Sequence, residues 1–367
     1  MLSYIFYTAL VVTFPFLLHE IFQVRQAAFQ ISGIFFVSTV YSLPLAYRGI
    51  TGTDSLQYYT TFTYGQGHWK RYNTVEAGFS FFMDICRNAK LPIAFFYFWI
   101  AFVSLLCFCL VLYLEQNRVD VFLAAFYYST TLYVRAFNIC RQVMAISIVL
   151  LAVDLALRGK RIIPMMLVVF ACLFHISAII GLAVIIVIYI FQLHIPVKYI
   201  RMLGIIATVI VLYCVCNPHV LSRIVQTLFD STYYAGYFSR ENLHVGTIIK
   251  NLLVSLPIAI VVLSRLRSND FWTVIMVSLS VFGLLITSMG GDTGRIGLYL
   301  SVFCALTVAL RQEDTEKILN IYAVRSRNIR IVAFLLRLTM FLYLFAVFVF
   351  HYLYKNYGEI IPYIPMW

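Results

Sequence analysis

The stretch PIAFFYFWIAFVSLLCFCLVLYL, residues 92–114, contains no charged side chain. A helix of about 20 apolar residues is long enough to cross the hydrocarbon core of a bilayer, which is about 30 Å thick. Comparable runs of about 17 to 25 apolar residues recur along the whole chain. The chain is 62% hydrophobic and 11% charged, with a mean hydropathy of +0.90, whereas about 25% of the residues in soluble domains are charged. The sequence therefore predicts an all-α polytopic integral membrane protein.

About twelve transmembrane helices are predicted from these runs and from the polar residues between them. They lie near residues 2–18, 28–46, 92–114, 120–134, 141–157, 162–175, 177–192, 199–216, 247–264, 271–289, 295–310 and 331–353. The polar stretches between them have the length of loops, and no repeat or linker occurs, so residues 1–367 are interpreted as a single membrane domain. The first run lacks a basic start and a small-residue cleavage site, which favours a retained helix over a signal peptide.

Short loops rich in Lys and Arg tend to stay in the cytoplasm. Four such segments occur, at residues 158–161, 194–201, 265–267 and 311–330. If all four face the cytoplasm, an even number of crossings must separate consecutive segments. We therefore expect the motif FHIS, residues 174–177, to divide the apolar stretch between the first two segments into two helices.

The same parity places several polar segments on the periplasmic or extracellular side. These are the loops near residues 47–90 and 217–246, the turn at 135–141, FHIS, and GGDTGR at 290–295. The segment 74–90 is left open between a re-entrant helix, an interfacial amphipathic helix and a short crossing. A crossing there would invert the topology upstream of it.

Polar side chains recur at the start of the predicted helix at 141–157. Arg135, Asn138, Arg141 and Gln142 follow one another at spacings of three and four residues, which places them on one face of a helix. Arginines at an interface can simply reach lipid headgroups. However, the positive-inside tendency depletes Arg from short outer loops, and polar residues at membrane depth are candidates for function.

Four further candidates come from two outer segments. In YRGITGTDSLQYY, residues 47–59, Arg48 follows a predicted helix and Asp54 is suited to cap a helix that carries Tyr58 one turn later. The alternative is a helix cap followed by tyrosines at the membrane interface. Glu76, further along, is suited to act as a general base or to orient an acceptor.

Three other outer segments carry candidate ligands. His175 interrupts an apolar stretch and is either a structural histidine or a catalyst. Arg295 and Tyr299 lie on one helical face after a glycine-rich turn, whose backbone N–H groups suit an anion, although Arg295 is also suited to be a structural anchor. Tyr234 and Tyr237, in the 217–246 loop, fit either a sugar-stacking surface or an amphipathic helix among headgroups.

Arginines near tyrosines and a histidine, in a chain of net charge +12, indicate an anionic, amphiphilic ligand. Arg binds phosphate oxygens in a bidentate manner, which suits a lipid-linked diphosphate. The chain has no HExxH, CxxC, DxD or P-loop motif, and its eight cysteines lie mostly in apolar runs, as packing residues do. Basic residues dispersed on both sides of a membrane exclude nucleic acid as a partner. Transport of an ion or solute stays open.

The motifs YRGITGTDSLQYY, EAGF, NICRQVMA, FHIS and GRIGLYL occur in this order over residues 47–301. This set resembles the EpsG family, the Wzy-like polymerases of O-antigen and exopolysaccharide repeat units. The resemblance implies a GT-C-like membrane glycosyltransferase in the bacterial inner membrane, active on the periplasmic side. It would transfer a growing glycan from undecaprenyl diphosphate to a new lipid-linked repeat unit. A protein that regulates chain length is a further candidate partner.

The resemblance also implies roles for residues at motif positions. Arg141 and Arg295 are expected to stabilise the diphosphate, and Asp54 or His175 to act as the base, with Asp54 slightly favoured. The other expected substrate contacts are Arg48, Tyr58, Glu76, Arg135, Asn138, Gln142, Tyr234, Tyr237 and Tyr299. No cofactor is expected, and metal independence is favoured because arginines can replace a divalent ion. The alternatives are an O-antigen ligase and a flippase or transporter of lipid-linked oligosaccharides.

Overall fold

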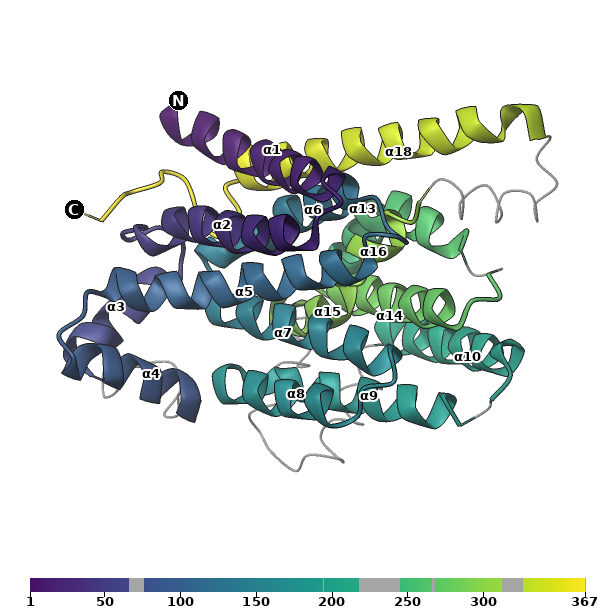
Figure 1. The fold of residues 1–367 in the computed structure, drawn as a ribbon, viewed down its shortest axis with the longest axis horizontal. Coiled ribbons are helices and arrows are strands. Elements are labelled where there is room, and N and C mark those ends of the chain that lie inside the picture. Colours follow the sequence, from purple (N-terminus) through teal and green to yellow (C-terminus); the bar gives the residue numbers. More distant parts are fainter. Residues whose placement is uncertain (66–75, 194, 218–244, 266–267, 312–325, 367) are drawn as a thin grey trace. The chain divides into compact units, whose positions relative to one another are not determined.

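The computed structural model describes residues 1–65, 76–193, 195–217, 245–265, 268–311 and 326–366, and no strand occurs in these ranges (Figure 1). The chain divides into two compact units. The first consists of Met1–Ile186 and Phe341–Trp367, and the second of Val187–Met340. The helix α9, Ile179–Phe191, begins in the first unit and ends in the second.

The first unit contains the helices that carry most of the sequence motifs. They are α1 (Leu2–Gln23), α2 (Ala27–Ala46), α3 (Ser55–Tyr64), α4 (Ala77–Asn88), α5 (Ile93–Glu115), α6 (Val121–Tyr128), η2 (Ser129–Tyr133), η3 (Val134–Phe137), α7 (Cys140–Leu157), α8 (Ile162–Phe174), η4 (Ile176–Ala178) and η6 (Val349–Tyr354). Within this unit α2 packs against α5, α5 against α7 and α7 against α8 (Figure 1).

The second unit is built from longer apolar helices and one helical hairpin. Its elements are α10 (Val197–Cys216), α13 (Val245–Leu263), α14 (Phe271–Ser288), α15 (Gly291–Ser301), α16 (Cys304–Val308) and the first part of α18 (Ser326–Phe348). The α14 helix packs against α10, α13 and α15. Val215, Ile248 and Met289 form a buried apolar cluster between these helices.

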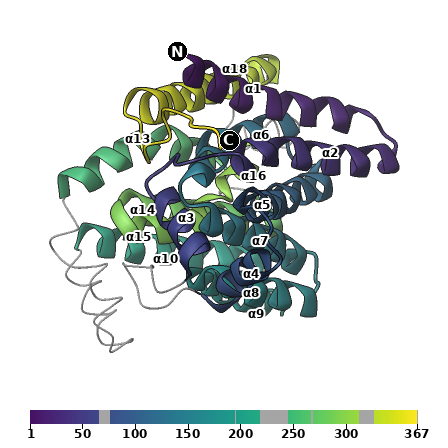
Figure 2. The same ribbon diagram turned by 90° about the vertical axis from the view of Figure 1, so that its left-hand side faces the viewer.

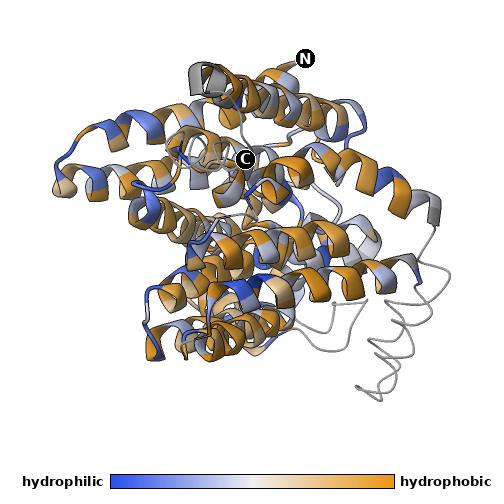
Figure 3. Cartoon of the chain, turned by 90° about the vertical axis from the view of Figure 1, so that its right-hand side faces the viewer, coloured by the Kyte–Doolittle hydropathy of each residue, from blue (hydrophilic) through white to orange (hydrophobic). Residues whose placement is uncertain are grey.

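In the described parts of the chain, eight helices are long and apolar enough to cross a membrane. They are α1, α2, α5, α7, α10, α13, α14 and the stretch Phe334–Tyr354 that joins α18 to η6. The apolar α8 and the stretch Ile176–Phe191 are shorter. Apolar residues cover most of the helices, and polar ones gather at turns and helix ends (Figure 3). The chain is therefore a multi-pass membrane protein, as the sequence predicted.

The predicted helix at 120–134 differs from the observed structure. Regular α-helix ends at Tyr128 and continues as the π-helix η2 and the 3-10 helix η3. Thr130 donates a hydrogen bond to the Phe126 carbonyl at 2.7 Å, and Thr131 donates one to the Tyr127 carbonyl at 2.6 Å. Hydroxyls that bond to backbone carbonyls in this way compete with the regular ladder and distort the helix.

The segment 74–90, left open by the sequence, contains the helix α4. Its 12 residues extend about 18 Å along the axis, which is short of a hydrocarbon core of about 30 Å. It packs against α3, α5 and α8 (Figure 2). Because α4 is too short to cross, the end of α2 and the start of α5 lie at the same end of the unit.

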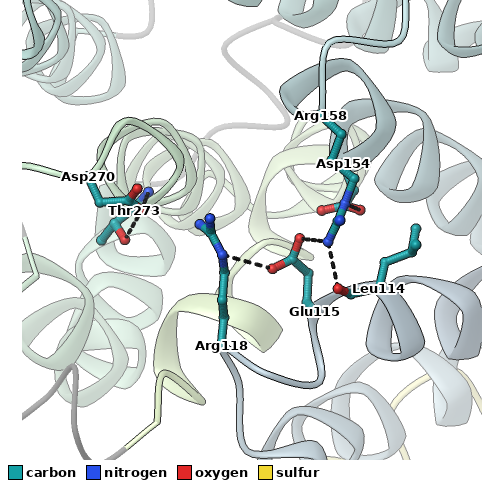
Figure 4. Close-up of polar contacts among 7 residues, drawn as sticks. All are labelled: Leu114, Glu115, Arg118, Asp154, Arg158, Asp270 and Thr273. Carbon is teal, nitrogen blue, oxygen red and sulfur yellow. Dashed lines mark hydrogen bonds and ion pairs between the residues drawn. The ribbon is translucent and has the colours of Figure 1, made fainter.

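The opposite end of α5 and α7 carries a cluster of charged residues (Figure 4). Arg158 pairs with Glu115 and, at 3.0 Å, with Asp154, and it donates a hydrogen bond to the Leu114 carbonyl. Arg118 lies 3.6 Å from Glu115. Both carboxylates are buried, so the two arginines offset their charges at this end. Figure 4 also draws Asp270, in the second unit, which caps α14 through Thr273.

Candidate functional site

Four of the five motifs meet at one end of the first unit, where α2 ends, α7 begins and α8 ends. The loop at 48–54 lies against residues 136–138. Gly52 has a φ of +90°, and a Cβ on it would lie 2.5 Å from the Phe137 carbonyl oxygen. Only glycine allows this close approach.

Asn138 connects this loop to the start of α7. Its side-chain oxygen accepts hydrogen bonds from the Thr53 hydroxyl at 2.8 Å and from the Asp54 backbone N–H at 3.0 Å. Asp54 directly precedes α3, as the sequence predicted, but its carboxylate makes no capping hydrogen bond among the described residues. The half-buried Asp54 side chain is thus placed by its backbone.

Arg48 has no exposed surface and packs beneath the site. Its guanidinium donates a hydrogen bond to the Ala136 carbonyl at 2.5 Å and lies 4.5 Å from the centre of the Tyr97 ring. Two of its nitrogens, Nε and Nη2, have no hydrogen-bond partner among the described residues. This side chain supplies a buried positive charge next to the start of α7.

Tyr58 lies one turn after Asp54 and is 2% exposed. Its ring contacts those of Phe79 and Tyr97, at centroid distances of 5.7 and 6.4 Å, and its hydroxyl accepts a hydrogen bond from Arg141. Burial raises the pKa of Tyr58 well above its ordinary value, because a phenolate loses its hydration there. The hydroxyl is therefore protonated at neutral pH and can donate a hydrogen bond.

Arg141 and Glu76 form an ion pair, with side chains that are 16% and 17% exposed. The other oxygen of Glu76 accepts a hydrogen bond from the Ile176 backbone N–H at 3.2 Å. The Arg141 guanidinium also lies 5.3 Å from the centre of the Phe79 ring. This pair therefore joins three motifs, from α7, from the start of α4 and from the turn between α8 and α9.

Gly78 allows α4 to approach the end of α8. A Cβ on Gly78 would lie 2.7 Å from the Leu173 Cβ and 2.9 Å from the Leu173 carbonyl oxygen. The two helices pack against each other. In the motif EAGF, the glycine thus brings Glu76 to the turn that contains Ile176.

His175 follows the last residue of α8, at the predicted turn. Its backbone is extended and its side chain is half-buried. The His175 carbonyl accepts a hydrogen bond from Ala178 at 3.0 Å, which starts η4. Gln142 is buried in the first turn of α7, next to Arg141.

Arg135 has different partners from Arg141. Its Nε donates a hydrogen bond to the Tyr352 hydroxyl at 2.8 Å, and its guanidinium lies 5.9 Å from the centre of the Tyr357 ring. Both tyrosines belong to the last part of the chain. Arg135 therefore anchors that part of the chain to the site.

Sequence reasoning missed the C-terminal segment 356–366, which runs along the loop at 47–54. Its carbonyls at Gly358 and Glu359 accept hydrogen bonds from the N–H groups of Thr53 and Gly52 at 3.2 and 3.1 Å. Further along, Gly49 donates to the Ile364 carbonyl at 2.6 Å. The only local signal is a group of Asn, Gly and Pro residues after the last apolar run.

The fifth motif, GRIGLYL, belongs to the second unit. Arg295 is partly exposed on α15, and Tyr299 is fully buried. A Cβ on Gly297 would lie 2.4 Å from the Thr287 backbone nitrogen, so this glycine allows α14 and α15 to pack closely. Tyr234 and Tyr237 lie outside the described residues.

The fold and this group of residues define a multi-pass membrane protein with a polar site at one end of its first helical unit. The EpsG family matches residues 31–364, a range that includes all five motifs. The chain belongs to the EpsG family, a family of Wzy-like polysaccharide polymerases, which confirms the resemblance seen in the sequence. Comparisons with curated proteins and with solved structures find no match.

Proposed function

We propose that this chain polymerises oligosaccharide repeat units linked to undecaprenyl diphosphate into O-antigen or exopolysaccharide. Family membership gives the reaction class, which is glycosyl transfer. The observation that carries the proposal is the Arg141–Glu76 pair, which joins three motifs from separate helices. A mostly buried arginine with one exchangeable carboxylate partner is suited to bind a phosphate oxygen.

In the proposed reaction, the bond between the anomeric carbon of the growing glycan and its diphosphate breaks. A bond forms between that carbon and a hydroxyl oxygen of a new lipid-linked unit, and the proton of this hydroxyl passes to a base. Arg141 takes the charge that develops on the departing diphosphate. Arginine side chains supply the positive charge, and we propose that no metal ion or cofactor is required.

Asp54 is the proposed base. Its carboxylate does not cap α3 and has a long contact, 3.5 Å, with the Thr53 hydroxyl. Its backbone is held by Asn138, and a carboxylate placed in this way is suited to take a proton from an acceptor hydroxyl. His175 is the alternative, because it belongs to the turn whose next residue, Ile176, contacts Glu76. The protonated Tyr58 hydroxyl next to Arg141 is suited to donate to the diphosphate.

We further propose about twelve crossings in a GT-C-like arrangement in the bacterial inner membrane. The motif end of the first unit would face the periplasm and the end with Arg158 the cytoplasm. This orientation is supported by the position of the basic segment 158–161, which follows α7 at the end opposite Arg141.

The test uses purified protein and the lipid-linked repeat units that accumulate in the membranes of a strain from which this chain has been deleted. Polymerase activity produces a ladder of glycan lengths on a gel. A single product on a lipid core acceptor would instead indicate a ligase. Movement of the lipid-linked unit across a vesicle membrane without a new glycosidic bond would indicate a flippase. Either of the last two results overturns the proposal.

A further inference from the structure

The C-terminal segment 356–366 contains three residues whose backbone lies in the left-handed region. Asn356, Gly358 and Glu359 have φ values of +49°, +79° and +54°, a region in which residues other than glycine are uncommon. The Asn356 side chain holds this shape, because it donates to the Ile361 carbonyl at 2.7 Å and accepts from the Ile361 N–H at 2.8 Å. Such strain persists only where the surroundings enforce it, and it is often found at functional sites.

This shape directs two consecutive carbonyls towards the loop that precedes Asp54. The Gly358 and Glu359 carbonyls accept from the N–H groups of Thr53 and Gly52. Gly358 also lies against Asn138, since a Cβ on Gly358 would be 3.2 Å from the Asn138 side-chain nitrogen. Asn138 is thus enclosed between the C-terminal segment and the two residues that it bonds.

The segment is held independently at several other points. Tyr7, in α1, donates to the Ile360 carbonyl at 2.8 Å, and Tyr363 donates to the Pro44 carbonyl at 3.0 Å. The Arg135 guanidinium lies 5.9 Å from the centre of the Tyr357 ring and also bonds Tyr352, which precedes the segment. The segment is therefore a fixed support for the loop at 47–54.

We propose that the C-terminal segment 356–366 belongs to the active site and that Gly358 and Asn138 are positioning residues, which set the place of Asp54 for proton removal. This inference rests on the proposed function. It gives Asn138 a role other than substrate contact, because its side-chain oxygen is already used by Thr53 and Asp54. A displacement of about 1 Å at a reacting group costs about 100-fold in rate.

The first test compares Gly358→Ala with Gly159→Ala. The two glycines have nearly the same φ, +79° and +78°, but a Cβ on Gly159 has no atom within 4 Å. The backbone cost of the substitution is thus matched, and only Gly358→Ala adds a Cβ 3.2 Å from the Asn138 side-chain nitrogen, which must shift by a few tenths of an ångström to accommodate it. We expect Gly358→Ala to lower kcat about 10- to 100-fold, with little change in the KM for the lipid-linked unit, and Gly159→Ala to have little effect.

A double-mutant cycle tests whether the effect passes through Asn138. In an Asn138→Ala background, Gly358→Ala should cause little further loss. A second pair keeps the proposal testable if Gly358→Ala fails to fold. Thr53→Val removes the 2.8 Å hydrogen bond to Asn138 and the 3.5 Å contact with the Asp54 carboxylate, and it should lower kcat. Thr53→Ser keeps the hydroxyl, so its kcat should stay close to that of wild type.

Equal rates for Gly358→Ala and Gly159→Ala, or equal rates for Thr53→Val and Thr53→Ser, would overturn the inference. A separate readout keeps its failure distinct from failure of the proposed function. Hydrogen exchange of the Gly52, Thr53 and Asp54 amides, measured in detergent without substrate, should accelerate in Gly358→Ala. If wild-type protein forms no ladder while this exchange still accelerates, the proposed function fails and the positional coupling stands. Unchanged exchange refutes the coupling itself.

Discussion

Arg141 and Glu76 form an ion pair in which both side chains are mostly buried. Burial removes hydration from both charges, so the pair itself adds little net stability, and each charge needs a partner. An incoming diphosphate can replace Glu76 as the counter-ion of Arg141 without leaving the guanidinium unpaired. Glu76 keeps its bond to the Ile176 N–H. The pair is therefore suited to exchange a protein carboxylate for a ligand.

We predict that Arg141→Ala extends lipid-linked units about 100- to 1000-fold more slowly than wild type, since removing one donor to a developing negative charge costs this much. Arg141→Lys keeps the charge but loses the forked geometry of the guanidinium. Its rate should therefore lie between the rates of wild type and Arg141→Ala. The measurement is ladder formation per mole of purified protein.

The matched control is Arg118→Ala, at the other end of the unit. Arg118 is 47% exposed and lies 3.6 Å from Glu115, which keeps Arg158 as its partner. Removing Arg118 should therefore change the rate of ladder formation little. An Arg141→Ala protein that works as fast as Arg118→Ala would refute the role of Arg141.

Sequence patterns indicated which polar residues lie near one another at this end of the unit, but not which residues they bond. Spacing placed Arg135 and Arg141 on one face, yet Arg135 bonds Tyr352, which lies 217 positions further along the chain. Helical periodicity describes neighbours at three and four residues and contains no information about such distant contacts. The burial of Arg48 beneath the Tyr97 ring was unpredictable for the same reason.

The position of α4 depends on a close contact between Gly78 and the end of α8. We predict that Gly78→Ala lowers thermal stability in detergent, because overpacking a tight contact costs about 1–3 kcal/mol. Its Cβ would meet the Leu173 side chain and backbone at 2.7 and 2.9 Å. Activity should fall as well, since the displaced α4 carries Glu76 away from Ile176.

Gly246→Ala is the control, because Gly246 is also the second residue of its helix and a Cβ there would have no atom within 4 Å. Identical melting temperatures for the two variants would show that the α4–α8 contact is not tight.

Helix positions were largely predictable, because an apolar run of membrane length leaves little choice of structure. The residues near 92–114 became α5, Ile93–Glu115, almost unchanged. The exceptions are local. Hydroxyls at Thr130 and Thr131 bond to backbone carbonyls and distort the helix, and the predicted helix at 295–310 is divided into α15 and α16. The helices α3 and α4 are too short and polar to give a membrane signal.

For the whole molecule, the proposed orientation predicts which side each end of the first unit faces. Gly159→Cys and Tyr357→Cys place thiols at exposed positions at opposite ends. A membrane-impermeant maleimide should label only Tyr357→Cys from the periplasmic side, and only Gly159→Cys in inverted vesicles. The wild-type chain, whose described cysteines are buried or half-buried, is the reference. Labelling of both variants from the same side would contradict the orientation.

Contacts between distant parts of the chain were the least predictable feature. The family motifs end near residue 301, and nothing in the composition of residues 356–366 indicates that they complete the loop at 47–54. Backbone carbonyls and glycines make these contacts, and such groups leave no chemical pattern in a sequence.

The hydrogen bond between Thr51 and Ile364 joins residues 313 positions apart, and this has a consequence for biosynthesis. Ribosomes deliver a chain from its N-terminus, so the loop at 47–54 is translated long before Ile364 and can form this hydrogen bond only after that residue has been synthesised. A stalled or prematurely terminated product can insert its helices and still lack a finished site. The contacts between this loop and residues 356–366 therefore form only after all the intervening helices have been translated.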